Sequence, residues 1–178
     1  MHCRIYCLLI FFKSQIRSDA QMAKNGEQGL EIKRMLVPID GSVDSKKAIV
    51  LAIKLAKLLG ASLTFLHCVP VPYYTSQMAG GLLLRQKYLE ESTKFAEDII
   101  SNAKQSAKKE GLPDSAVGSM VLYDVVSIAD SIVNVAARSD IDMIIIGSKG
   151  LTGIKKFLLG SVTSGVVSHA SCPVLVAK

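Results

Sequence analysis

Short runs of apolar residues alternate with segments of helical periodicity from Met35 to the end of this 178-residue chain. The first run, 35–39 (MLVPI), ends in the turn-forming sequence DGS, and the next segment repeats apolar residues every three to four positions up to Gly60. A continuous short apolar run is typical of a strand that is buried on both faces of its sheet. Strands that alternate with helices, without hairpin turns, predict a parallel sheet with helices on both faces.

The alternation continues through the rest of the chain and predicts a single α/β domain with five strands. The first helix is expected to use Ser42 or Asp44 as its N-cap. Residues 73–84 are expected to form a loop, because Gly80 and Gly81 interrupt any regular element there. The expected strands are 35–39, 62–69, 116–122, 143–147 and 173–177, and the expected helices are 45–60, 85–110, 126–138 and 160–170.

The composition favours a globular protein in a reduced, cytoplasmic setting. Apolar residues make up 49% of the chain, which is too many for a disordered protein, and no apolar run reaches the roughly 18 residues that span a bilayer. The cysteines show no CxxC pair and no zinc-ligand spacing, so neither a structural metal nor a disulfide framework is indicated. Cys68 and Cys172 are expected to be inert buried residues.

Residues 1–34 precede this pattern and are expected to form a disordered N-terminal extension, with the folded domain at 35–178. The extension places Arg4 before the eight-residue apolar run 5–12, which resembles a secretory signal, but no convincing cleavage site follows. A signal peptide or membrane tether is the alternative. The extension holds six Lys/Arg and three Asp/Glu, which is half of the net charge of +6, and the remainder is too mild to predict nucleic-acid binding.

The segment 147–163 is the part of the sequence that most strongly predicts a ligand. Gly147 and Gly150 would let the backbone turn sharply after a buried strand and approach a ligand without interference from Cβ atoms. The sequence from Gly160 to Thr163 opens a helix, whose free N–H groups and dipole attract an anion. Three lysines add positive charge, namely Lys149, Lys155 and Lys156. A phosphate-bearing ligand is therefore predicted, and a flexible glycine-rich connector is the alternative.

The glycines match neither a Walker A motif nor a GxGxxG after the first strand. They follow the spacing G-x2-G-x9-G-[S/T] at Gly147, Gly150, Gly160 and Ser161, which resembles the nucleotide motif of the universal stress protein (UspA) family. The flanking sequences MLVPIDGS, FLHCV, DMIIIGSKG and LLGSVTSGVVSHASCPVLV are similar to the family as well. The resemblance covers 35–178 and points to the ATP-binding branch of the family.

The resemblance implies a Rossmann-like fold of the adenine nucleotide alpha hydrolase-like type, with strand order 3-2-1-4-5. It also implies ATP as the ligand, with Mg²⁺ or Mn²⁺ at the phosphates. Asp40 would face the nucleoside or hold that cation, and an Asx-type turn is the alternative role for its carboxylate. The residues implied to contact ATP are Pro38, Asp40, Cys68, Gly147, Lys149, Gly150, Gly160, Ser161, Val162 and Thr163.

One segment departs from the family pattern. Many members carry Gly-x-Pro just after the third strand, where this chain has Val126-Ser127-Ile128. In the family this position borders the part of the pocket that holds adenine, so Val126 is expected to narrow the pocket wall there. Elsewhere, Lys155 and Lys156 are expected to lie on a solvent face, His67 to be a core histidine, and His169 to complement the negative end of the last helix.

The last strand, 173–177, is expected at an edge of the sheet, because Pro173 cannot donate to a strand ladder. In the family this strand pairs with its mate, which implies a homodimer; an edge covered by the N-terminal extension is the alternative.

The protein is expected to act as a nucleotide-dependent regulatory module in a stress response. The sequence offers no general base or activated nucleophile beside the glycine-rich segment, so at most slow ATP hydrolysis with Mg²⁺ is expected. The alternative is an adenine-nucleotide hydrolase or transferase that uses the same pocket with Asp40 on the metal. A nucleotide-free scaffold that acts through its dimer surface is a third interpretation.

Overall fold

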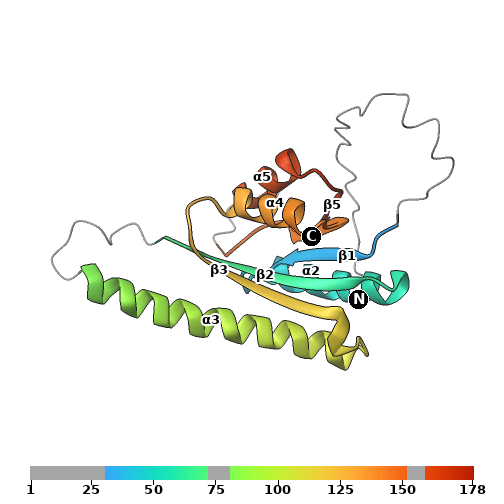
Figure 1. Ribbon diagram of the computed structural model, residues 1–178, viewed down its shortest axis with the longest axis horizontal. Coiled ribbons are helices and arrows are strands. Elements are labelled where there is room, and N and C mark those ends of the chain that lie inside the picture. Colours follow the sequence, from blue (N-terminus) through green and yellow to red (C-terminus); the bar gives the residue numbers. More distant parts are fainter. Residues whose placement is uncertain (1–30, 72–80, 152–158) are drawn as a thin grey trace.

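The computed structural model describes residues 31–71, 81–151 and 159–178. Within these ranges the chain forms a five-stranded sheet with helices on both faces (Figure 1). The strands are β1 (Arg34–Pro38), β2 (Ser62–Pro70), β3 (Val117–Val125), β4 (Met143–Gly147) and β5 (Val174–Ala177). The helices are α2 (Val43–Leu59), α3 (Gly81–Lys109), α4 (Ile128–Arg138) and α5 (Ser161–His169), with a short 3-10 helix η1 (Asp114–Ala116).

The strand order is β3-β2-β1-β4-β5, and every neighbouring pair is parallel. The predicted parallel sheet and its order 3-2-1-4-5 are therefore confirmed. The chain moves outward from β1 to β3 and then crosses back to β4, so the order reverses between β1 and β4. In open α/β sheets ligands bind outside the carboxyl ends of the strands at such a reversal.

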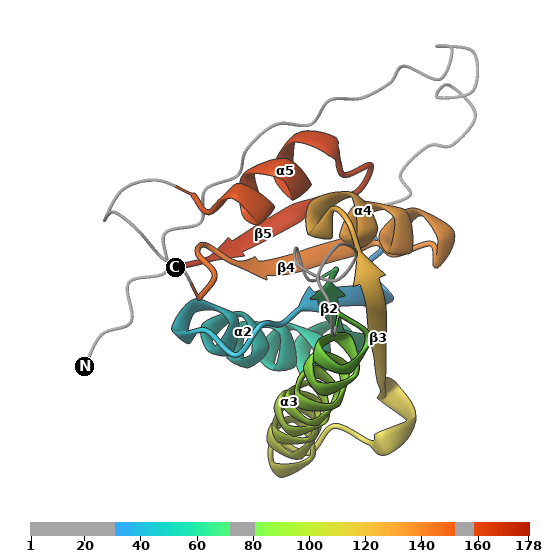
Figure 2. The ribbon, with the colours of Figure 1, turned by 90° about the vertical axis from the view of Figure 1, so that its left-hand side faces the viewer.

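Two apolar cores lie on opposite faces of the sheet. Helices α2 and α3 cover one face, and α4 and α5 cover the other (Figure 2). Met35 and Val37 belong to the first core, whereas Leu36 belongs to the second, because successive side chains of a strand point to opposite faces. This double burial explains why β1 is apolar at every position from Met35 to Pro38.

The first helix begins and ends at residues that the sequence indicated. Ser42 is the N-cap of α2, and its Oγ accepts a hydrogen bond from the N–H of Ser45 at 3.1 Å. Gly60 ends the helix with a φ of 66°, in the left-handed region that favours glycine.

Several predicted boundaries are wrong. α3 begins at Gly81 instead of 85, because the first N–H groups of a helix need no intrahelical acceptor and a glycine is tolerated there. The rest of the expected loop, 73–80, lies outside the described residues. β3 continues to Val125 instead of 122, and α4 begins at Ile128 after the N-cap Ser127.

The structure also bears on where the domain begins. Arg34 already belongs to β1, and the N–H groups of Lys33 and Arg34 donate to Asp142 Oδ2 at 2.9 and 2.8 Å. Residues 1–30 lie outside the described part, so the expected disorder of the extension stays a prediction. Among the helices of the described ranges, none has the length and apolar character that crossing a membrane requires.

Candidate functional site

A cavity of about 140 Å³ lies at the carboxyl ends of β1, β2 and β4, beside the first turns of α4 and α5. The ten residues predicted to contact ATP all line it, although they come from segments far apart in the sequence. They are Pro38 and Asp40 after β1, Cys68 in β2, Gly147, Lys149 and Gly150 after β4, and Gly160, Ser161, Val162 and Thr163 at the start of α5. Their convergence is a property of the structure, and their contact with a ligand stays a prediction.

The apolar wall of the cavity was missed by sequence reasoning. It includes Leu66, Ile146 and two residues of α4, Ile128 and Ile132. Apolar residues in strands and helices are typical of any protein core, so their sequence does not identify them as cavity residues. The only sequence feature that pointed to this wall was the departure from Gly-x-Pro at 126–128. The expectation for Val126 is wrong, because Val126 is 95% exposed in the turn before α4 and Ile128 lines the cavity instead.

Asp40 links the end of β1 to the glycine-rich segment after β4. Its Oδ1 accepts from the N–H of Ser42 at 3.0 Å, which is the Asx-type contact, and its Oδ2 accepts from the N–H of Leu151 at 3.2 Å. A carboxylate offers about four lone-pair sites, so these two bonds leave acceptor capacity toward the cavity. Both interpretations of Asp40 are therefore compatible with its geometry.

Gly147 is required by packing inside the protein. A Cβ atom on Gly147 would lie 2.7 Å from the carbonyl carbon of Asp44 and 2.7 Å from the nitrogen of Ser45, both in the first turn of α2. The glycines with positive φ in the described ranges are Gly41, Gly60 and Gly111, so Gly147 does not serve a left-handed turn. Gly147 therefore leaves room for α2, and because it also lines the cavity, its predicted approach to a ligand stays a prediction.

Gly150 differs, because its missing Cβ faces the cavity rim. A Cβ there would lie 2.9 Å from Asp40 Oδ2, which is the end of a side chain that lines the same cavity. The absence of a side chain at Gly150 therefore leaves the Asp40 carboxylate free to reach Leu151.

The start of α5 presents backbone donors to the cavity. Gly160 is the N-cap, its own N–H donates to the Ser148 carbonyl at 2.8 Å, and the first bond within the helix runs from Ser164 N–H to the Gly160 carbonyl at 2.8 Å. The N–H groups before that bond have no acceptor within the helix, and the helix dipole makes this end attractive to an anion. These N–H groups belong to Ser161, Val162 and Thr163, which all line the cavity.

The hydroxyl of Thr163 is used inside the protein. Thr163 is buried, and its Oγ1 donates to the Gly147 carbonyl at 2.7 Å. This bond joins α5 to the end of β4, so the hydroxyl proton of Thr163 is directed at the backbone. Of the two hydroxyl-bearing residues expected to contact ATP, the exposed Ser161 is the one better placed to donate to a ligand.

His67 and Cys68 have the environments expected of core residues. His67 is buried, and its Nδ1 lies 2.8 Å from the Ile39 carbonyl, so Nδ1 is the nitrogen that carries a proton in this bond. Its ring packs edge-on against Phe95 with centroids 5.8 Å apart. Burial raises the pKa of the Cys68 thiol to about 11, which keeps the thiol protonated and unreactive at neutral pH.

The predicted lysines and His169 have different outcomes. Lys149 lines the cavity, whereas Lys155 and Lys156 lie outside the described residues. His169 is the last residue of α5, and its Nδ1 lies 2.8 Å from the Gly165 carbonyl, in keeping with its expected place at the negative end of the helix. In the described ranges no group of three His, Cys, Asp or Glu side chains is placed to hold a metal ion.

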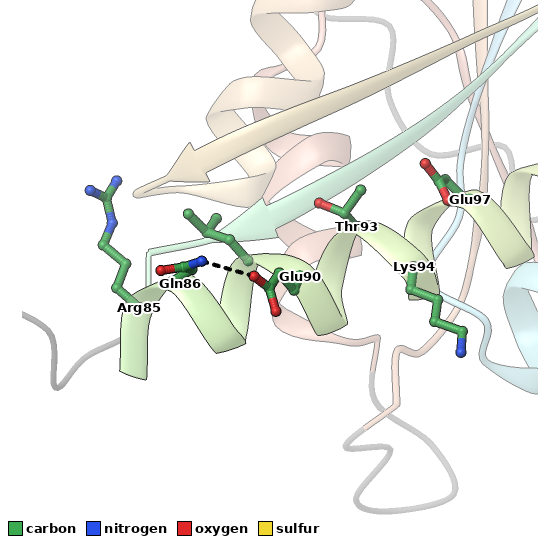
Figure 3. Close-up of a pocket in the computed structure, with 7 residues that line it drawn as sticks. Arg85, Gln86, Glu90, Thr93, Lys94 and Glu97 are labelled. Carbon is green, nitrogen blue, oxygen red and sulfur yellow. Dashed lines mark hydrogen bonds between the residues drawn. The ribbon is translucent and has the colours of Figure 1, made fainter. Parts of the chain in front are cut away.

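A second hollow, of about 750 Å³, lies along α3 (Figure 3). Every lining residue comes from this one helix, and Gln86 Nε2 donates to Glu90 Oε1 at 3.1 Å. The side chains of Arg85 and Lys94 point away from each other (Figure 3). Because these groups do not converge, we assign no site to this surface.

Solved structures share this fold. The universal stress protein UspA from Lactobacillus plantarum superimposes with a TM-score of 0.73 at 25% identity, over 83% of this chain and 99% of that one. A universal stress protein in complex with cAMP does so with a TM-score of 0.61 at 23% identity, over 83% and 98%. The universal stress protein from Archaeoglobus fulgidus in complex with dAMP has a TM-score of 0.57 at 21% identity, over 84% and 100%. For the two structures at 23% and 21% identity, the likeness shows the fold alone.

Sequence comparisons agree with the fold. Universal stress protein YxiE from Bacillus subtilis is 33% identical over 150 residues, which is 82% of this chain and 98% of that protein. Universal stress protein MJ0531 from Methanocaldococcus jannaschii is 32% identical over 156 residues, covering 87% and 86%. The sequence model of the Universal stress protein family matches residues 31–178. The chain therefore belongs to the universal stress protein family.

Proposed function

We propose that this protein binds ATP in the cavity at the β1–β4 reversal and acts as a nucleotide-dependent regulatory module in stress response. The observation that carries the proposal is the convergence of the glycine-rich segment, the start of α5 and Asp40 on one cavity. The structural relatives solved with cAMP and dAMP support an adenine nucleotide as the ligand class.

The chemistry of the cavity agrees with the parts of a nucleotide. The free N–H groups at the start of α5 suit phosphate oxygens, the Asp40 carboxylate can accept from ribose hydroxyls, and the wall that contains Ile128 and Ile132 suits a flat apolar base. The volume of about 140 Å³ is smaller than the roughly 300–1,000 Å³ of pockets that enclose drug-sized ligands. ATP would therefore be held partly in the cavity and partly along its open rim.

A divalent cation would enter with the nucleotide. Asp40 is the only acidic residue among the described lining residues, so it could supply one ligand to Mg²⁺ or Mn²⁺. Mg²⁺ commonly binds through one or two carboxylates together with phosphates and water. Such an ion would neutralise phosphate charge.

The lining favours binding over rapid catalysis. The thiol of Cys68 is protonated, and both oxygens of Asp40 already accept N–H groups. Fast hydrolysis needs a base within reach of the attacking water. A hydrolase or transferase with Asp40 on the metal is the second candidate, favoured by the presence of that carboxylate on the cavity wall.

The experiment that tests this proposal starts from the full chain, purified without added nucleotide. Mass spectrometry after denaturation should identify co-purified ATP, and calorimetric titration with ATP·Mg²⁺ should show one site per chain. Turnover far below about 1 per second would support the regulatory module, whereas turnover of roughly 1–10 per second would support the enzyme. No bound nucleotide, no heat of binding and no thermal shift with millimolar ATP·Mg²⁺ would leave the nucleotide-free scaffold.

The edge of the sheet at β5 supports a proposal about how the protein assembles. β5 is an edge strand with partly exposed side chains from Val174 to Val176, and an open edge offers its backbone groups to a second copy. We propose a cytoplasmic homodimer that pairs through this edge. Size-exclusion chromatography with light scattering should give twice the chain mass of 19.1 kDa at micromolar concentration, and a strictly monomeric protein would contradict the dimer.

A further inference from the structure

A hydrogen bond between two side chains that lie outside the cavity lining supports the glycine-rich segment. Ser148 Oγ donates to Asp44 Oδ2 at 2.6 Å, and neither residue is among those that line the cavity. Ser148 is 2% exposed, so its hydroxyl has little access to water as an alternative partner. The bond connects the segment after β4 to the first turn of α2.

Ser148 also fixes the start of α5. Its N–H donates to the Ala177 carbonyl at 2.7 Å, and its carbonyl accepts from the N–H of Gly160 at 2.8 Å. Gly160 is the N-cap of α5, the helix whose first N–H groups face the cavity. A displacement of Ser148 would therefore displace both the glycine-rich segment and the cap of that helix.

Asp44 is a charged and well-held acceptor for Ser148. Its other oxygen, Oδ1, lies 2.8 Å from Lys47 Nζ. Burial raises the pKa of Asp44, but hydrogen bonds from Lys47 and Ser148 and the charges of Lys47 and Lys149 outweigh that effect, so the pKa lies below its ordinary value. A hydrogen bond to an ionised carboxylate is shorter and stronger than one between neutral groups.

We propose that Asp44 and Ser148 are positioning residues, which hold the glycine-rich segment and the start of α5 in the arrangement that accepts phosphate. The inference rests on the proposed nucleotide site and adds to it two residues that do not touch the ligand. The negative charge of Asp44 by itself repels an anion, so its benefit to binding must come from geometry. Charge and geometry consequently predict opposite effects for substitutions at Asp44.

The test is calorimetric titration of ATP·Mg²⁺ into the full-length wild-type protein, S148A, D44A, D44N and the double variant S148A/D44A. S148A and D44A should each weaken affinity about tenfold, the size expected when a hydrogen bond to a charged group is lost. The double variant should lose little more, because both changes remove one bond. D44N should bind within about threefold of wild type or more tightly, since an amide oxygen still accepts from Ser148 while the repelling charge is gone.

The matched control is S62A. Ser62 Oγ donates to the Lys33 carbonyl at 3.1 Å at the opposite end of the sheet, so this variant also loses one serine hydrogen bond and should keep wild-type affinity. Melting temperatures are recorded for every variant, and titrations are made well below the lowest of them. A purely structural role would lower the melting temperatures of S148A and D44A and leave their affinities unchanged.

The outcomes separate this inference from the proposed function. If wild type does not bind ATP·Mg²⁺, the proposed function fails and the inference fails with it. If wild type binds and both S148A and D44A match S62A, only the inference is overturned. Tighter binding by both D44A and D44N would also overturn it, because charge alone would then explain the effect. If S148A does not fold, D44A and D44N test the inference in its place. These two variants are expected to fold, since the Asp44 side chain is 16% exposed and lies in the first turn of α2.

Discussion

The end of β4 approaches the first turn of α2 so closely at Gly147 that a Cβ there would lie 2.7 Å from the carbonyl carbon of Asp44. Backbone atoms form this contact, so no side chain can turn aside to relieve it. We expect Gly147→Ala to lower the free energy of unfolding by about 1–3 kcal/mol, the usual cost of overpacking. Urea unfolding measures this, with Gly118→Ala as control because a Cβ at Gly118 meets its nearest atom at 3.5 Å. Equal stability of the two variants would contradict this explanation of Gly147.

Gly150→Val is expected to impair binding more than stability. Its Cβ would lie 2.9 Å from Asp40 Oδ2, the end of a side chain that can rotate, so the fold should survive while the rim of the cavity is filled. Affinity for ATP·Mg²⁺ should fall at least about tenfold, or about 1.4 kcal/mol. Gly118→Val, in an edge strand remote from the cavity, is the matched control. Wild-type affinity in folded Gly150→Val would refute the assignment of Gly150 to the site.

Gly165 is expected to control how closely α5 packs on α4. A Cβ at Gly165 would lie 2.8 Å from the Cβ of Ala129, so Gly165→Ala should push the two helices apart and lower the unfolding free energy by about 1–3 kcal/mol. The double variant Gly165→Ala with Ala129→Gly removes the facing Cβ and should recover much of the lost stability. A double-variant cycle in urea checks this, and additive losses would show that the two atoms do not compete for space.

Cys68 is expected to make stability fall at alkaline pH. Burial raises its thiol pKa from 9.0 to about 11, so between these values the unfolded chain loses a proton that the folded protein keeps. The free energy of unfolding should therefore be undiminished below about pH 9 and fall by up to about 2–3 kcal/mol as the pH rises to 11.

The measurement for Cys68 is urea unfolding from pH 8 to 11 in wild type and Cys68→Ala, which should have the shallower slope. Burial also raises the pKa of Cys172, so Cys172→Ala is the comparison that separates the two thiols. An unchanged slope in Cys68→Ala would mean that its thiol ionises as readily in the folded protein as in the unfolded chain.

Local patterns were sufficient to predict most of the fold. The apolar run at 35–39 predicted a strand buried on both faces, and Met35 and Leu36 do lie in separate cores. The α3 boundary was wrong because a Gly-Gly pair is read as a break, although a glycine can stand at the first position of a helix. Boundaries depend on such end effects, which periodicity does not report.

The sequence likewise predicted one part of the candidate site and missed another. The spacing of Gly147, Gly150 and Gly160 identified the segment that surrounds the cavity, but Ile128 and Ile132 looked like any helix residues facing a core. Nothing in the local sequence shows that these isoleucines border a cavity, because their neighbours across it come from β2 and β4.

The sequence by itself determined the order of strands and helices, the glycine spacing and the family to which they belong, because these depend on residues close together in the chain. Only the tertiary structure decided that Gly147 makes room for α2, that Thr163 bonds to the Gly147 carbonyl, and that Ser148 meets Asp44. Each of these contacts joins two different elements, and their distances are set by how α2 and α5 pack at the end of β4.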